Sequence, residues 1–183
     1  MRARAPRKCA IIKQADIVLL SHLFSNLFDA ETIARNFDYY ERRCDHGSSL
    51  SSSIHALVAA RLGRLEEARR YLHQAASIDL DDSMGNTAQG IHSGAAGGLW
   101  QAMIMGFAGM MLAGDRLSFD PHLLPEWKSL AFAVLFRGNR FEVILRAAPG
   151  ASEFVLAEGD GASIKLQGRG QKYLTRAEQK WVT

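Results

Sequence analysis

IHALVAARLGRLEEARRYLHQAASI, residues 54–78, decides how this chain folds. Residues 54–62 predict a helix, and Gly63 predicts its end, because glycine readily takes the left-handed conformation that follows many helices. In residues 65–78 the apolar side chains fall at positions 65, 68, 72, 75 and 76, which is the spacing of one face of a second helix. The centre of the chain is therefore predicted to be a pair of helices joined by a short turn.

Three further helices are predicted on either side of this pair. Residues 15–28 are apolar at 17, 20, 24, 27 and 28, and residues 31–43 carry the acidic Glu31 near their start, where the helix dipole favours negative charge. Residues 95–108 carry apolar side chains at Leu99, Trp100, Met103, Ile104 and Phe107. The methionines at 103, 105, 110 and 111 and the tryptophans at 100 and 127 are predicted to lie in the core.

The periodicity changes to that of strands at about residues 110–116. Phe132, Val134 and Phe136 stand at alternate positions, as do Phe141, Val143 and Leu145, and residues 137–140 (RGNR) predict the hairpin turn between them. Residues 152–158 and 162–167 predict a second pair of strands. The predicted fold class is mainly α with a small antiparallel β part at the C-terminus.

Composition and charge exclude several functions. The chain has 183 residues, 48% hydrophobic content and a net charge of +3, but its first eight residues hold four basic side chains and no acid. The rest has 18 basic and 19 acidic side chains, so no nucleic-acid surface is predicted. No uninterrupted apolar stretch is long enough to cross a membrane, so no membrane partner is predicted either. Cys9 and Cys44 form no disulfide or zinc pattern, so no metal or cofactor is predicted and the expected compartment is the reducing cytoplasm.

The chemistry is concentrated in His46-Gly47-Ser48-Ser49-Leu50-Ser51-Ser52-Ser53. Hydroxyls and backbone N–H groups donate hydrogen bonds to anionic oxygens, and an imidazole can add charge, so this segment suits a phosphate or a hydroxyl-rich ligand. A solvated turn or a helix cap is the alternative interpretation. The segment contains no carboxylate that would repel an anion.

Two other short motifs accompany this loop, namely Lys13-Gln14-Ala15-Asp16 and Gly90-Ile91-His92-Ser93-Gly94-Ala95. Together the three resemble the C-terminal part of glycoside hydrolase family 65, which includes the maltose, trehalose, kojibiose and nigerose phosphorylases. The resemblance covers residues 11–143 and implies the last helices of an (α/α)6 barrel followed by a small antiparallel β-sandwich. It implies four segments: an atypical basic start at 1–10, barrel helices at 11–112, the sandwich at 113–170 and an unmatched tail at 171–183.

The resemblance also implies roles for residues. Ser48, Ser49 and His92 would contact phosphate, and Lys13 and Gln14 would hold hydroxyls of a glucosyl unit. The reaction would be inverting phosphorolysis of an α-linked glucose disaccharide, with inorganic phosphate as co-substrate and nucleophile. The family's general acid, a glutamate, lies upstream of the Lys-Gln pair, so no catalytic residue is assigned in this chain. The chain is expected to be a fragment, with little or no activity of its own, that associates with the missing part of the barrel or as a homodimer.

Alternatives remain open. A hydrolase of the same family could use Asp45 or Glu41 as the base. A helical interaction module is a third reading, since ARLGRLEEARRYLHQAASID resembles one tetratricopeptide repeat, although no second copy follows. Among the site residues, Lys13 could be a solvated cation and His92 a buried histidine bonded to the backbone. Gly94, Gly97 and Gly98 are predicted to allow close helix packing.

Overall fold

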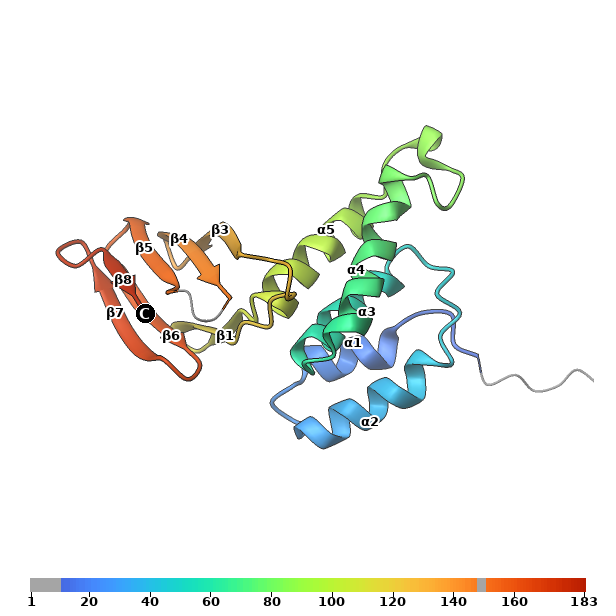
Figure 1. Cartoon of the computed structure of the whole chain (residues 1–183), viewed down its shortest axis with the longest axis horizontal. Helices are drawn as coiled ribbons and strands as arrows, with labels where there is room; N and C mark the ends of the chain where they lie inside the picture. The colour runs from blue at the N-terminus through green and yellow to red at the C-terminus, as the bar shows by residue number, and fades with distance from the viewer. Residues whose placement is uncertain (1–10, 148–150) are drawn as a thin grey trace, which may run out of the picture.

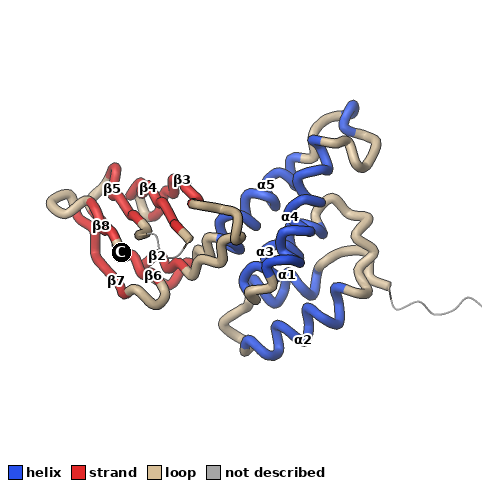
Figure 2. Tube along the Cα trace, in the orientation of Figure 1, coloured by secondary structure: helices blue, strands red, loops and turns tan. Residues whose placement is uncertain are grey.

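A computed structural model describes residues 11–147 and 151–183 of the chain. Within them the helices come first and the strands second, and the two parts lie side by side along the long axis of the molecule (Figures 1 and 2). The predicted fold class is confirmed. The basic segment 1–10, which includes Cys9, lies outside the described residues.

The helical part contains every predicted helix, with shifted ends. The helices are α1 (Asp16–Leu23), α2 (Ala30–Glu41), α3 (Ser51–Arg61), α4 (Leu65–Leu80) and α5 (Ser93–Gln101), with a short 3-10 turn at Thr87–Gln89 and a π-helical turn at Ala102–Phe107. Helix α1 ends five residues before the predicted boundary. Helix α2 begins where Asp29 accepts a hydrogen bond from the Thr32 N–H at 2.6 Å, an N-cap that the apolar spacing does not reveal.

Helix α3 is the centre of the helical core. It begins at Ser51, three residues before the predicted start, so the last three serines of the polar loop belong to a buried helix. Helices α1, α4 and α5 and the π-helical turn all contact α3. Small side chains such as Ala56, Ala59 and Ala60, all buried, let these neighbours approach closely.

Glycines on the α5 side of this contact explain the close approach. A Cβ atom at Gly98 would lie 2.3 Å from the Ser53 Oγ, and one at Gly94 would lie 3.2 Å from the Leu50 Cδ2. The predicted packing role of these two glycines is confirmed. At Gly97 an added Cβ would meet nothing within 4 Å, so this glycine serves no close contact and the prediction is wrong there.

The strands form two four-stranded sheets. One has the order β1-β2-β6-β7, with bounds Met111–Ala113, Arg116–Phe119, Gly161–Leu166 and Gly170–Thr175. The other has the order β3-β4-β5-β8, with bounds Ser129–Phe136, Asn139–Arg146, Glu153–Glu158 and Lys180–Val182. Strands β7 and β8 come from residues 170–182, so the segment that the motifs leave unmatched completes both sheets.

One predicted hairpin is confirmed and the other is wrong. Strands β3 and β4 pair in antiparallel register around Arg137 and Gly138, which have φ angles of 50° and 76°. Two positive φ values in a two-residue loop match the twist of a hairpin. Strands β5 and β6 do not pair. Strand β5 pairs with β4 and β8, while β6 pairs with β7 and, in parallel, with β2. Both segments alternate, and alternation shows which face is buried but not which strand lies alongside.

The second core lies between the two sheets. Phe119, Phe141 and Phe154 are buried there, and Trp181 near the C-terminus stacks on Phe154 with ring centroids 5.3 Å apart. Ile104 and Met110, at the junction of the two parts, belong to the same cluster. The expectation that the tryptophans lie in the core is wrong for Trp100, which is half exposed on α5, and Met111 is also exposed. Across the described residues, no helix combines the length and the apolar character needed to cross a membrane.

Candidate functional site

The polar loop runs from Asp45 to Leu50 between α2 and α3, and the N-terminal segment holds its start. The Ile12 N–H donates to the Arg43 carbonyl at 2.9 Å, and the Asp45 N–H donates to the Ile12 carbonyl at 2.8 Å. This short parallel bridge brings Lys13 and Gln14, which follow Ile12 directly, beside the start of the loop. Both side chains are exposed.

The hydroxyls of the predicted polar segment, residues 46–53, fall into two groups. Ser51 and Ser53 are buried and engaged inside the protein: Ser53 Oγ donates to the Leu50 carbonyl at 3.1 Å, and Ser51 Oγ lies 3.8 Å from the Cys44 Sγ. Ser48 and Ser49 are half-buried, and Ser48 Oγ accepts from the Leu50 N–H at 3.4 Å just before α3. The first group lies within α3, and the Ser48 contact, just before the helix, is of the kind that the alternative of a turn or a helix cap predicts.

A cavity of ≈ 590 Å³ lies between this loop and α4. Its lining includes Ser48, Ser49 and Ser52 from the loop side, His73, Gln74 and Ser77 from α4, and Ser83 from the loop that follows. His46 and Gly47 also contribute. Five serines, two histidines and a glutamine line the cavity together with Gly47, Ile78 and Met84, and none of these residues is acidic. Such a lining offers hydrogen-bond donors to an anion and no carboxylate to repel it.

His92 is held by a carboxylate that the sequence motifs do not single out. Its Nδ1 lies 2.7 Å from Asp79 Oδ1, and its backbone N–H donates to Asp79 Oδ2 at 3.0 Å. Because the carboxylate is an acceptor, Nδ1 carries the proton and the ring orientation is fixed. Asp79 is in the last turn of α4 and His92 immediately precedes α5. The alternative of a buried histidine bonded to backbone is therefore wrong.

The predicted site residues are grouped in part. Ser48 and Ser49 share the cavity, whose lining does not include Lys13, Gln14 or His92. Helix α4 provides a link, because Ser77 and Ile78 line the cavity and the adjacent Asp79 holds His92. Helices α3 and α5 begin, and α4 ends, at the same end of the helical part (Figure 1). That end carries the cavity, and we assign the candidate site to it.

Beneath the loop lies a polar cluster that joins His46 and Glu41, both considered in the sequence analysis, to Tyr71 and Arg70, which it missed. The Tyr71 hydroxyl donates to Glu41 Oε1 at 2.5 Å, Arg70 donates to the same oxygen at 3.1 Å, and His46 Nε2 lies 3.4 Å from the Tyr71 hydroxyl. Burial raises the pKa of the Glu41 carboxyl, but the hydrogen bonds from Tyr71 and Arg70 outweigh it, so the pKa ends below its usual value. Burial, followed by the Glu41 hydrogen bond, raises the pKa of Tyr71.

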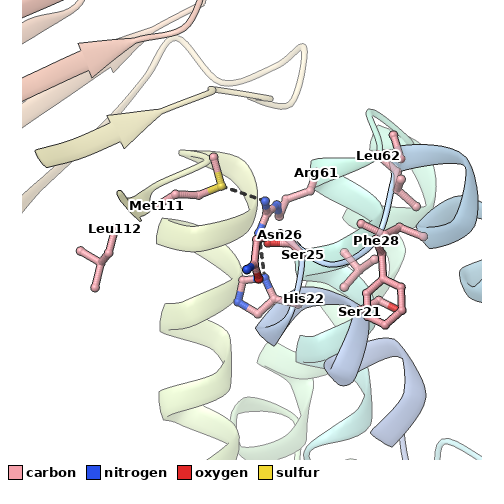
Figure 3. Close-up of a pocket in the computed structure, with 12 residues that line it drawn as sticks. Ser21, His22, Ser25, Asn26, Phe28, Arg61, Leu62, Met111 and Leu112 are labelled. Carbon is pink, nitrogen blue, oxygen red and sulfur yellow. Dashed lines mark hydrogen bonds between the residues drawn. The ribbon is translucent and has the colours of Figure 1, made fainter. Parts of the chain in front are cut away.

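A second cavity, of ≈ 500 Å³, lies between α1, the end of α3 and the start of β1. Figure 3 shows Arg61 reaching between two partners there: its guanidinium lies 2.9 Å from His22 Nδ1 and donates to the Met111 Sδ. Burial and the Arg61 charge lower the pKa of His22 to about 4. None of the residues predicted for the site lines this cavity.

Two family models match the chain in the order of its two parts. The glycosyl hydrolase family 65 central catalytic domain matches residues 2–101, and the family 65 C-terminal domain matches residues 110–173. The chain belongs to glycosyl hydrolase family 65. The predicted resemblance is confirmed, and the interval between the two models, residues 102–109, contains the π-helical turn that precedes β1.

Among the family 65 relatives of this chain are disaccharide phosphorylases. The chain is 40% identical over 136 residues to a kojibiose phosphorylase of Halothermothrix orenii, a match that covers 74% of this chain and 17% of that enzyme. It is 34% identical over 173 residues to an α,α-trehalose phosphorylase of Geobacillus stearothermophilus, which covers 94% of this chain and 22% of that enzyme. The chain thus spans about a fifth of the length of these relatives.

A solved structure gives the same result for the fold. The chain superimposes on a proposed kojibiose phosphorylase from the human microbiome with a TM-score of 0.83 and 28% identity. The superposition covers 94% of this chain and 22% of that one. The helical and β parts of this chain therefore share their arrangement with a segment of a family 65 protein.

Proposed function

We propose that this family 65 chain forms the phosphate side of an active site that cleaves an α-linked glucose disaccharide by inverting phosphorolysis. The observation that carries the proposal is the lining of the cavity between the loop and α4, with its serines and histidines and no acidic residue. A phosphate that attacks the anomeric carbon needs a binding site that holds and aims it, and needs no protein base. The relatives include a kojibiose phosphorylase and an α,α-trehalose phosphorylase, which supports phosphorolysis as the reaction.

Each predicted residue has a role in the proposal. The Ser48 and Ser49 hydroxyls donate to phosphate oxygens. His92, oriented by Asp79 through Nδ1, presents Nε2 to the same anion. Lys13 offers three donors and Gln14 offers a donor and an acceptor, which suits the hydroxyls of a glucosyl unit. Inorganic phosphate acts as co-substrate, and no cofactor is required.

The proton donor for the leaving sugar is proposed to come from polypeptide outside these 183 residues. In the same proposal, residues 11–112 are the last helices of an (α/α)6 barrel and residues 113–170 are the sandwich that follows them. Apolar side chains exposed on and after α1, at Leu20, Leu23 and Leu27, support contact with further helices or with a second copy of the chain.

The free, buried Cys44 thiol suits a reducing compartment such as the cytoplasm.

Hydrolysis is the competing reaction. Glu41 is a poor base for it, because Tyr71 and Arg70 already donate to its carboxylate. Asp45 is exposed, and its carboxylate lies beside Gly47, where an added Cβ would be 3.1 Å from Oδ2. Asp45 does not line the cavity. In the assembled enzyme, ¹⁸O from labelled water should stay out of the sugar product, and its incorporation without added phosphate would establish hydrolysis.

Phosphate titration tests the proposal on the chain itself. We expect saturable binding of inorganic phosphate by calorimetry, and a Kd at least about tenfold higher in the double variant Ser48→Ala/Ser49→Ala, which corresponds to a loss of about 1.4 kcal/mol. Ser129→Ala, at an exposed serine of β3, is the matched control and should bind as the original chain does. Equal affinity in the double variant would overturn the assignment of these serines.

Turnover provides an independent check. The isolated chain should release little or no glucose 1-phosphate from kojibiose, nigerose, maltose or trehalose, since the acid side of the site is proposed to lie elsewhere. Release at an ordinary enzymatic rate would show that the general acid lies within these residues.

A further inference from the structure

Three residues around the start of α3 bring metal-binding atoms together. Cys44 precedes the polar loop, His46 lies within it and His55 is on the second turn of α3. One ligand atom from each of the three lies within 4.8 Å of the others. The rings of His46 and His55 meet at an angle of 67°, with centroids 4.6 Å apart, so they converge without stacking.

His55 is fully buried and already has the tautomer of a metal ligand. Its Nδ1 lies 2.8 Å from the Ser51 carbonyl oxygen, which only accepts hydrogen bonds, so Nδ1 carries the proton. The lone pair is therefore on Nε2, which is buried and has no hydrogen-bond partner. A backbone carbonyl that holds the remote N–H is the usual outer contact of a ligating histidine. Burial lowers the pKa of His55 to about 4, so the ring is neutral at pH 7.

His46 completes the same pattern from the loop. Its Nε2 faces the Tyr71 hydroxyl at 3.4 Å, and that hydroxyl gives its own proton to Glu41. The Tyr71 oxygen therefore accepts from Nε2–H, and the lone pair is on Nδ1, which is buried and unpartnered. The backbone of His46 has a φ angle of 56°, a conformation that side chains other than glycine rarely adopt. Such backbone strain concentrates at functional sites.

Cys44 supplies the third group. The thiol is buried and free, and the bridge between Ile12 and Arg43–Asp45 fixes its backbone. Thiolate and imidazole are the ligands that Zn²⁺ prefers, at bond lengths of about 2.3 and 2.0 Å. At these lengths the ligand atoms of a tetrahedral site lie roughly 3.3–3.6 Å apart. The ligand atoms now lie within 4.8 Å of one another, so metal binding requires side-chain movements that shorten these separations by up to roughly 1.5 Å.

We propose that Cys44, His46 and His55 bind a Zn²⁺ ion between the polar loop and α3. The three ligands leave the fourth position of a tetrahedral site to a water molecule or an anion. The ion enters from the cavity, because His46 lines it. The bound metal links the loop to α3, and it holds His46 without using Ser48, Ser49 or His92. The metal site therefore uses none of the proposed phosphate contacts, although His46 also lines the cavity that holds Ser48 and Ser49.

Cobalt provides the spectroscopic test. Full-length chain stripped with chelator and then titrated with Co²⁺ should bind one equivalent, with a thiolate-to-cobalt charge-transfer band and the intense visible bands of a tetrahedral ion. Added Zn²⁺ should displace the Co²⁺ ion, so the charge-transfer band and the visible bands should both disappear. Cys44→Ser should abolish the charge-transfer band, while Cys9→Ser should keep it. His73→Gln, at an exposed histidine of the same cavity, should also leave the titration unchanged.

The histidines are tested by affinity. His46→Asn is the preferred variant, because asparagine tolerates a positive φ and the loop can keep its shape. It should weaken Co²⁺ binding by at least about tenfold, and His55→Asn should do the same if circular dichroism shows that it folds. A charge-transfer band that survives Cys44→Ser, or affinity unchanged in His46→Asn, would overturn the proposal. Absence of any stoichiometric Co²⁺ binding by the original chain would do so as well.

Discussion

The helical part and the β part of this chain differ in how they cover apolar surface. The two sheets bury a common core between them, and few large apolar side chains of the described strands are exposed, namely Met111 and Leu112 in β1 and Leu135, Tyr173 and Val182 in later strands. The helical part exposes many more, including Ile11, Leu20, Leu23, Phe24, Leu27, Leu80, Ile91 and Trp100. Apart from β1, the β part is therefore a closed unit, whereas the helices present surfaces that suit further partners.

Two buried polar sites, one in each part, contrast in how their hydrogen bonds are satisfied. In the β part, the Asn139 side chain donates to the Phe136 and Arg137 carbonyls and accepts from the Gly161 N–H at 2.7 Å. In the helical part, His46 Nδ1 and His55 Nε2 are buried without a partner. Arg116 Nε and Thr183 Oγ1 in the β part also lack a partner, but the two imidazole nitrogens belong to one cluster beside the candidate site. Unsatisfied polar atoms are costly, so such a pair indicates a functional constraint at this place.

The largest effect is expected in the closed core. Phe141→Ala should lower the free energy of unfolding by about 3–5 kcal/mol, because the ring is fully buried and its removal leaves a cavity. Chemical denaturation measures the change. Leu135→Ala, at a side chain that is 75% exposed on the adjacent strand, is the control and should change stability by less than about 0.5 kcal/mol. Similar losses in both variants would contradict the closed β core.

The next effect concerns the packing of α3. Gly106→Ala should cost about 1–3 kcal/mol, because the new Cβ would lie 2.9 Å from the Leu57 Cα and backbone cannot move aside easily. Gly97→Ala is the matched control in the same stretch of chain. The added Cβ at residue 97 would meet nothing within 4 Å, and alanine has a higher helix propensity than glycine. This variant should therefore be neutral or stabilise the protein by up to about 1 kcal/mol. Thermal melts that rank the two in the opposite order would disprove the close contact.

Acid sensitivity of the helical part gives a smaller effect. The folded pKa of His22 is about 4, below the ordinary 6.5, so the unfolded chain binds the extra proton first as pH falls. His22 should therefore reduce stability between about pH 6.5 and 4, by on the order of 2 kcal/mol after allowance for its partial exposure, and should have no effect above pH 7. His22→Gln, which can still accept from Arg61, should lose less stability across that range. His55 titrates over the same range, so the difference between the two proteins is the quantity to measure. Identical dependence of stability on pH in the original chain and in His22→Gln would contradict the lowered pKa of His22.

The smallest effect on stability is expected on the open helical surface. Leu23→Gln and Leu27→Gln change side chains that are 62% and 69% exposed, so each should alter the free energy of unfolding by less than about 0.5 kcal/mol. Their expected effect is on association: light scattering should show less self-association of the chain at high concentration. A large loss of stability in either variant would mean that these leucines belong to the core.

Much of the fold could be predicted from the sequence because helix periodicity is local. The spacing within residues 65–78 and the glycine at 63 were sufficient to place α4 and the end of α3. The start of α3 was misplaced because serines that lie in a buried helix look the same in sequence as serines of a loop. The pairing of β5 and β6 was also wrong, since strand partners are chosen by contacts far apart in the chain.

The site was predicted less completely. Motif resemblance singled out Lys13, Gln14, Ser48, Ser49 and His92, and their roles remain predictions. Asp79 was missed because a carboxylate in the last turn of a helix has no distinctive pattern until His92 is folded against it. The cluster of Cys44, His46 and His55 was missed for a similar reason, because the spacing of these residues matches no common metal motif and only the contact of the loop with α3 brings them together.

The parallel pairing of β2 with β6 has a consequence for the order in which the protein is made. Strand β2 leaves the ribosome well before its partner, because Leu117 lies opposite Ile164 in the ladder. The β3–β4 hairpin can close as soon as it emerges, whereas Leu117 and Phe119 must wait for most of the remaining chain. During synthesis these two side chains are exposed to other nascent chains, so the last fifth of the polypeptide protects a strand made much earlier.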